Sequence, residues 1–231
     1  MAGRYEGIVR VEPEASSLGI YVYYGVVIGV HVEASPAELL QEFDRVAEEL
    51  KQVYGRPEEL SRDPVIQAYR KFYWRIGIDP TKTRPAGEAL ARRLLRGRGL
   101  PSINNVVDAG NVVSARLFVP IGIYDLDKFE PPARITLSRG GEVFRPIGGR
   151  GEEKLKPGIP IMVDAKGVVM HLYPHRDSID TCVKDETRSV LVVAAGVEGV
   201  PRERVEKAAR DTLNLIERYA GGEAHGVWRS P

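Results

Sequence analysis

The sequence contains a single cysteine, Cys182, among its 231 residues. One cysteine excludes a disulfide within the chain and a zinc site built from cysteines, and it is typical of proteins from a reducing compartment. An excess of charge of either sign is also missing, because the chain has 33 Lys and Arg and 32 Asp and Glu, for a net charge of +1. No overall field therefore draws the protein to nucleic acid or to a membrane, and any RNA contact needs a local basic patch.

Long apolar runs are absent as well. No run approaches the roughly 20 residues that a membrane helix requires, and the first residues have neither secretory nor transit-peptide character. The sequence has no glycine loop of the P-loop or dinucleotide type and no serine nucleophile elbow. We therefore expect a cytoplasmic protein without a membrane segment and without a cofactor. The 43% of hydrophobic residues suffice for a sizeable core.

The order of the predicted elements is strands, helices, strands and a final helix. Runs rich in Val, Ile and Tyr at 5–11 and 18–32 favour strands. Helices are predicted at 35–55, with Ser35 as N-cap, and at 65–75, 86–96 and 103–118. Short β-prone runs fill 121–197, a helix follows at 202–219, and we expect the tail 223–231 to be loose. This order indicates an α+β fold.

The segment 69–101, "YRKFYWRIGIDPTKTRPAGEALARRLLRGRGLP", mixes basic and aromatic residues. Such a mixture can bind phosphates and stack on bases, but it also fits aromatic residues in the core with arginines on solvated faces. Within it, the loop 79–85 could hold an anion at a helix N-terminus, or form a turn in which Asp79 bonds its own backbone. The RNA-binding candidates are Arg70, Lys71, Arg75, Lys82 and Arg84.

Two histidines, His171 and His175, lie on either side of Pro174. A metal site would need a third ligand, which Asp177 or Asp180 could supply, but the proline breaks any helix that would align the two imidazoles. We expect no metal. A histidine acting as a general base or a substrate ligand fits the pattern better.

The segment "SINNVVDAGNVVS" at 102–114 predicts a helix capped by Ser102. Asn104, Asp108 and Asn111 fall at i, i+4 and i+7 and form one polar stripe. Asn and Asp are poor residues for a helix interior, so their side chains should have fixed hydrogen-bond partners. Those partners are either neighbouring backbone groups or a ligand.

Three stretches together carry a family resemblance over about 69–193. They are "GIDPTKTRPAGEALARRLLRGRGLPSINNVVDAGNVVSARLFVPIGIYDLDKF", "RITLSRGGEVFRPIGG" and "PGIPIMVDAKGVVMHLYPHRDSIDTCVKDETRSVLVV". They resemble free-standing relatives of the B3/B4 domain, the editing module in the beta subunit of phenylalanyl-tRNA synthetase. The resemblance implies an α+β, B3/B4-like fold with a β-sandwich-like core and flanking helices. Residues 1–231 would form one domain, with the elements in 5–55 and the helix 202–219 packed on it.

The resemblance also implies a pocket that hydrolyses the ester of a mischarged aminoacyl-tRNA in trans. That reaction needs a positioned water and stabilisation of the oxyanion, without a metal or a covalent nucleophile. His175 and Asp177 are the implied catalytic residues. The implied substrate-binding residues are Asn104, Asn105, Asp108, Asn111, Tyr124, Asp125, Arg176, Ser178 and Thr187.

One position departs from the family pattern. Gly122 stands where synthetase modules commonly carry a histidine, two residues after the proline of "VPIGIYD". A non-catalytic module that binds tRNA, another RNA or an amino-acid-like ligand is therefore an alternative function. A structural module that assembles with a protein partner is a third, and the oligomeric state stays open.

Overall fold

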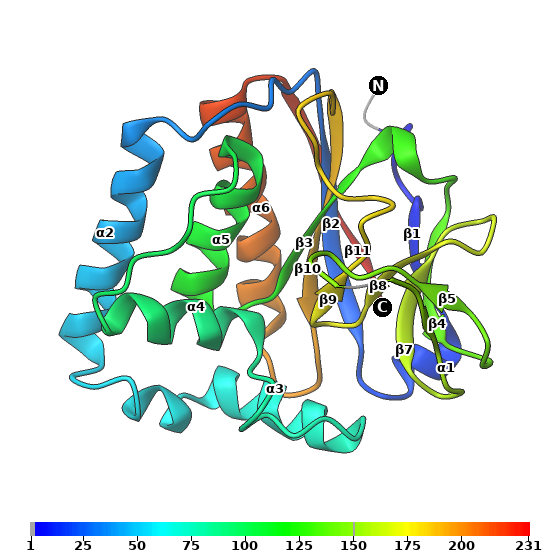
Figure 1. Ribbon diagram of the computed structural model, residues 1–231, viewed down its shortest axis with the longest axis horizontal. Helices are drawn as coiled ribbons and strands as arrows, with labels where there is room; N and C mark the ends of the chain where they lie inside the picture. The colour runs from blue at the N-terminus through cyan, green and yellow to red at the C-terminus, as the bar shows by residue number, and fades with distance from the viewer. Residues whose placement is uncertain (1–2, 150) are drawn as a thin grey trace.

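The computed structural model describes residues 3–149 and 151–231, which fold into three layers (Figure 1). Helices form one outer layer, a four-stranded sheet lies in the middle, and a five-stranded sheet forms the other side. This mixed arrangement of sheets and flanking helices confirms the predicted α+β class. That the whole chain forms one domain stays a prediction.

The middle sheet is antiparallel throughout, in the order β11-β2-β10-β3. Its strands are β2 (Tyr21–Ile28), β3 (Ile121–Asp125), β10 (Ser189–Gly196) and β11 (Glu223–Ser230). The expectation of a loose tail is wrong, because Glu223–Ser230 pairs along β2. Gly221 and Gly222 have φ of +69° and +86°, a conformation that glycine adopts without strain, and they turn the chain back onto the sheet.

The second sheet has the order β1-β4-β7-β8-β9, with β1 parallel to β4 and the other pairs antiparallel. A separate pair, β5 and β6, lies beside it. The bounds are β1 (Val9–Val11), β4 (Ala133–Leu137), β5 (Val143–Phe144), β6 (Glu153–Lys154), β7 (Pro160–Val163), β8 (Val169–Leu172) and β9 (Arg176–Asp177).

All five long helices lie where the sequence predicts them. They are α2 (Ala37–Val53), α3 (Pro64–Arg75), α4 (Ala86–Leu95), α5 (Asn105–Leu117) and α6 (Arg202–Ala220); the short elements are α1 (Pro13–Ser16), η1 (Glu59–Arg62) and η2 (Leu126–Lys128). Helices α5 and α6 cover the middle sheet, and α2 and α4 pack on α5. Among the described residues, no helix combines the length and apolar character needed to cross a bilayer.

Two predicted helix caps are wrong. The N-cap of α2 is Pro36 and that of α5 is Asn104, in place of Ser35 and Ser102. Both serine hydroxyls donate instead to the carboxylate of Asp108, at 2.6 Å and 2.7 Å. A buried carboxylate binds these hydroxyls more strongly than a neutral carbonyl would.

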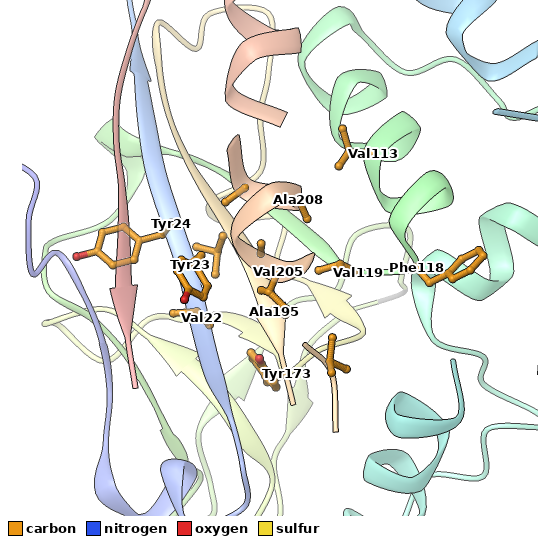
Figure 2. Close-up of a cluster of buried hydrophobic side chains, with 14 of the residues drawn as sticks. Val22, Tyr23, Tyr24, Val113, Phe118, Val119, Tyr173, Ala195, Val205 and Ala208 are labelled. Carbon is orange, nitrogen blue, oxygen red and sulfur yellow. The ribbon is translucent and has the colours of Figure 1, made fainter. Parts of the chain in front are cut away.

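The core joins both sheets to the helices (Figure 2). In Figure 2 the Tyr24 ring of β2 points away from Val205 and Ala208 of α6, toward the five-stranded sheet. Two other buried tyrosines donate to carbonyls at the end of β10: Tyr69 to Ala195 at 2.6 Å and Tyr173 to Gly196 at 2.8 Å. These bonds satisfy polar groups that burial would otherwise leave unpaired.

The aromatic residues of α3 belong to this core. Tyr69, Phe72 and Tyr73 are buried, so they cannot stack on bases. Trp74, the remaining aromatic residue of α3, is largely exposed, at 59%. The sequence allowed these aromatic residues either to stack on bases or to belong to the core. For the three buried side chains, the structure supports the core.

Candidate functional site

A cavity of about 60 Å³ lies between the two sheets, next to the first turn of α4. Strands β3 and β10 form one wall, and β7, β8 and the turn before β9 form the other. Most of the lining is apolar, but three polar side chains that can take part in acid-base chemistry reach it: His171, His175 and Asp177. This volume holds several water molecules.

His171 and Asp177 form a cross-strand pair at the cavity. They lie opposite each other in the register of β8 and β9, and Nδ1 of His171 is 2.8 Å from Oδ1 of Asp177. The rings of Tyr124 and Tyr173 pack edge-on against the imidazole, with centroid distances of 6.2 Å and 6.0 Å. When Nδ1–H donates a hydrogen bond to this carboxylate, Nε2 is the basic nitrogen of the ring.

His175 lies in the turn that connects β8 to β9. Its Nδ1 atom is buried and has no hydrogen-bond partner among the described residues. Burial, together with the neighbouring His171 and Arg176, lowers the pKa of His175 to about 4. The imidazole is therefore neutral at pH 7, and its unpaired nitrogen is available to a ligand or a water molecule.

Tyr124 on β3 lies across Gly122. A β-carbon at Gly122 would clash with the Tyr124 hydroxyl and the adjoining ring atoms. Burial, with the neighbouring Asp177 carboxylate, raises the pKa of Tyr124 well above its usual value. The phenol is therefore protonated at pH 7, and its ring fills the space that a side chain at position 122 would need.

A second pocket, of about 220 Å³, shares Ile121 and Asp177 with the cavity. Its walls are mostly aliphatic, from α5, β3 and three loops, and they include Ile103 and Ile147, which are 61% and 55% exposed. The polar side chains that line it are Asn111, Asp177 and Cys182. Burial raises the pKa of the Cys182 thiol, which makes it a poor nucleophile.

The family of the chain follows from its match to the B3/4 domain family model over residues 68–221. The chain belongs to the B3/4 domain family. It is 26% identical to the beta subunit of a phenylalanine–tRNA ligase from Methanococcus maripaludis, over 82% of this chain and 40% of that one. It is 21% identical to the beta subunit from Aquifex aeolicus, over 96% of this chain and 33% of that one.

A solved structure is also similar to this B3/4 domain. It is an N-terminal fragment of the phenylalanyl-tRNA synthetase beta subunit from Pyrococcus horikoshii, with a TM-score of 0.53 and 17% identity, covering 96% of this chain and 54% of that one. At this identity the likeness shows the fold, and it agrees with the predicted B3/B4-like architecture. The chain spans only a third to two fifths of the length of the two ligase subunits.

Three of the predicted substrate-binding residues at the start of α5 do not reach the cavity of this B3/4 domain. Asn104 caps α5 through its Oδ1 atom, which accepts from the amide of Val107 at 2.9 Å. The Asn105 amide donates to the carbonyls of His31 and Tyr219, at 2.9 Å and 3.1 Å. Buried Asp108 accepts from two serine hydroxyls and a backbone amide. Only Asn111 lines one of the two pockets.

Four more predicted substrate-binding residues also lie outside the cavity. Asp125 accepts from the hydroxyl of Thr187 at 2.7 Å, which ties β3 to the start of β10. Arg176 pairs with Glu153 at 2.8 Å on the surface. Ser178 bonds Asp180 at 3.3 Å. Of the predicted site residues, Tyr124, His175 and Asp177 meet at the cavity, together with His171, whose role as partner of Asp177 the sequence analysis missed.

The five RNA-binding candidates divide among three places. Arg70 is used inside the fold, because its Nε atom donates to buried Glu88 at 2.8 Å. Lys71 and Arg75 lie on α3, where Arg75 pairs with Glu198 at 2.9 Å. Lys82 and Arg84 lie beside α4.

The loop before α4 is a structural turn. Oδ1 of Asp79 accepts from the amide of Thr81 at 2.9 Å and from its hydroxyl at 2.6 Å. The turn reading of this loop is thereby confirmed, because the Asp79 side chain bonds its own backbone. Within residues 3–149 and 151–231, no group of three or more His, Cys, Asp or Glu side chains is placed to hold a metal ion.

Proposed function

We propose that this B3/4 domain hydrolyses the ester of a mischarged aminoacyl-tRNA in the cytoplasm, acting on tRNA that another protein has charged. The observation that carries the proposal is the His171–Asp177 pair at 2.8 Å, next to an unpaired nitrogen of His175, in a cavity with room for water. The two relatives named above are beta subunits of phenylalanine–tRNA ligases, which supports an aminoacylated tRNA as the substrate.

The proposed reaction is a direct attack by water. Asp177 holds His171 with its proton on Nδ1, and Nε2 accepts a proton from water as the oxygen attacks the ester carbonyl carbon. The bond from the carbonyl carbon to the ribose oxygen then breaks, and the proton passes to that oxygen. Neutral His175 offers its unpaired nitrogen to the reacting group. A positioned base of this kind contributes about 10²–10⁴-fold to the rate.

The aliphatic pocket supports an apolar amino acid as the group removed. It shares Asp177 with the cavity, so an aminoacyl group with its carbonyl at the cavity could place its side chain among the isoleucines. Apolar walls with a few polar groups are typical of small-ligand sites.

The test is a panel of tRNAs misacylated with each amino acid, with the released amino acid measured under single-turnover conditions. We expect release for at least one apolar amino acid, and a loss of about 100-fold or more in the rate for Asp177→Asn and for His171→Asn. His31→Asn, which changes an exposed histidine far from the cavity, serves as the matched control. A folded protein that releases no amino acid faster than buffer from any of the tRNAs contradicts the proposal.

A specific observation also favours binding without catalysis. Tyr124 fills the space beside Gly122, which leaves little room at the cavity for a reacting group. In this alternative the aliphatic pocket holds an amino-acid-like ligand that is not turned over. A thermal-shift screen with the twenty amino acids tests it, and stabilisation that Asn111→Ala abolishes, in a protein that hydrolyses none of the tRNAs, would support it.

A further inference from the structure

A groove of about 480 Å³ runs along α4 and concentrates positive charge. Six basic side chains line it: Lys82, Arg84, Arg92, Arg93, Arg96 and Arg98. Among the described residues, no carboxylate takes part in the lining. In a chain with a net charge of +1, so many cations in one concave surface create a strong local field.

Most of this charge is free for a ligand. Arg92 is neutralised by buried Glu88, to which its Nε atom donates at 2.6 Å. Arg93 donates to the carbonyl of Gly99 at 2.6 Å, which fixes the side chain but leaves its charge. Arg96 lies 3.8 Å from Glu58 in an exposed pair, which is weak.

The remaining three cations, Lys82, Arg84 and Arg98, are exposed, and they have no ion-pair or hydrogen-bond partner for their charged groups within residues 3–149 and 151–231. They lie beyond the two ends of α4, whose ten residues measure about 15 Å. Unpaired charge is therefore present at both ends of the groove.

The position of the groove connects it to the candidate site. Arg84 lines the groove, and Ala86, two residues later, lines the cavity. At the other end Pro101 lines the groove, and Ile103, two residues later, lines the aliphatic pocket. A chain of phosphates bound along α4 would thus lie next to both openings.

We propose that this groove binds the phosphate backbone of RNA. Arginine guanidinium groups bind phosphates with paired hydrogen bonds, and a concave row of them suits a strand better than a flat membrane surface. That the RNA is tRNA, with its aminoacyl end at the cavity, rests on the proposed function. Binding to RNA itself requires only the groove.

The test is the affinity for uncharged tRNA, measured by fluorescence anisotropy from about 50 to about 300 mM salt, where phosphate contacts weaken steeply. The groove variant is Lys82→Glu/Arg84→Glu/Arg98→Glu. The matched control, Lys128→Glu/Arg139→Glu/Lys154→Glu, changes the net charge equally at exposed residues outside the groove. Circular dichroism melting shows whether both variants are folded.

We expect the groove variant to bind about tenfold or more weakly at low salt, and the slope of log affinity against log salt to become less steep by about 2. The control should bind within about threefold of the unmodified protein. Equal weakening in both folded variants would overturn the inference. It would also be overturned if the unmodified protein bound anionic vesicles but no tRNA, and the groove variant lost the binding to vesicles.

Uncharged tRNA has no aminoacyl ester, so this result is independent of the proposed hydrolysis. A protein that binds tRNA through the groove but hydrolyses no mischarged tRNA contradicts the proposed function and leaves the inference standing. A protein that hydrolyses mischarged tRNA equally well with and without the groove cations contradicts the inference and leaves the proposed function standing.

Discussion

The hydroxyl of Tyr124 lies so close to Gly122 that a β-carbon on that residue would clash with it. The two residues are on the same face of β3, two positions apart, and the tyrosine ring leans over the glycine. Synthetase modules of this family, by the resemblance described above, commonly have a histidine at the position of Gly122. In this chain, the tyrosine and a histidine cannot both be accommodated without displacing the wall of the cavity.

Gly122→His should therefore destabilise the protein by about 1–3 kcal/mol or more, as overpacking of a core does. Removing the ring in the double variant Gly122→His/Tyr124→Ala should recover part of this loss. Urea unfolding of both single variants and the double variant gives the coupling free energy, which we expect to exceed about 1 kcal/mol. Additive effects would show that the two side chains do not compete for space.

Asp108 should act as a structural brace between the loop before α2 and the start of α5. Asp108→Ala leaves the hydroxyls of Ser35 and Ser102 and the amide of Ile103 without their acceptor, so we expect a loss of about 2–4 kcal/mol in unfolding free energy. Asn111→Ala, on the same helix, should change stability by less than about 1 kcal/mol but alter ligand binding. The measurements are urea unfolding and ligand titration. If Asp108→Ala changed ligand binding with little loss of stability, Asp108 would belong to the binding site.

Glu88 joins α3 to α4 through two arginines. Burial raises the pKa of Glu88, but hydrogen bonds from Arg70 and Arg92 outweigh it and hold the pKa below its usual value. Glu88→Gln leaves two arginines without their partner and should cost about 3–5 kcal/mol. Glu48→Gln, which breaks an exposed pair with Lys51, should cost less than about 0.5 kcal/mol in the same unfolding experiment.

The pH dependence of stability should report His175. Its pKa is about 4 in the folded protein and about 6.5 in the unfolded chain, so the unfolded chain takes up the proton first as the pH falls. Stability from this residue is therefore highest above pH 6.5 and decreases toward pH 4, by up to roughly 3 kcal/mol. Unfolding free energies measured from pH 7 to pH 4 should fall less steeply in His175→Asn. Parallel curves for the two proteins would mean that the imidazole is not desolvated.

The last strand should be essential for a stable fold. Deleting residues 223–231 removes β11 and exposes the edge of β2, so we expect aggregation or a large drop in melting temperature. Ser230→Ala tests one contact within it, because the Ser230 hydroxyl accepts from the amide of Val11 at 2.9 Å. That substitution should cost about 1–3 kcal/mol. A truncated protein that melts like the full chain would contradict the prediction.

The helices could be predicted because their signals are local. Apolar residues at helical spacing, together with proline or glycine at the ends, mark α2, α3, α4, α5 and α6 within a few residues. The final strand could not be predicted in this way. The segment "EAHGVWRS" has an internal glycine and little apolar alternation, and it becomes a strand because β2 offers it an edge to pair with.

The candidate site was only partly predictable for a similar reason. The residue types that reach the cavity are visible in the sequence, and His175 and Asp177 were selected from them. The partner of Asp177 depends on the register between β8 and β9, which the sequence does not specify. The sequence left the polar stripe of α5 with two interpretations, because one partner of Asp108 is Ser35, 73 positions away in the chain.

The position of β2 has a consequence for synthesis. This strand ends at Ile28, yet its neighbours, β10 and β11, begin only at Ser189 and Glu223. Contacts between such distant segments slow folding, since a long loop must close before they form. On the ribosome, the apolar residues of β2 must wait until these later strands have emerged, and during that time they are exposed to aggregation or to chaperones.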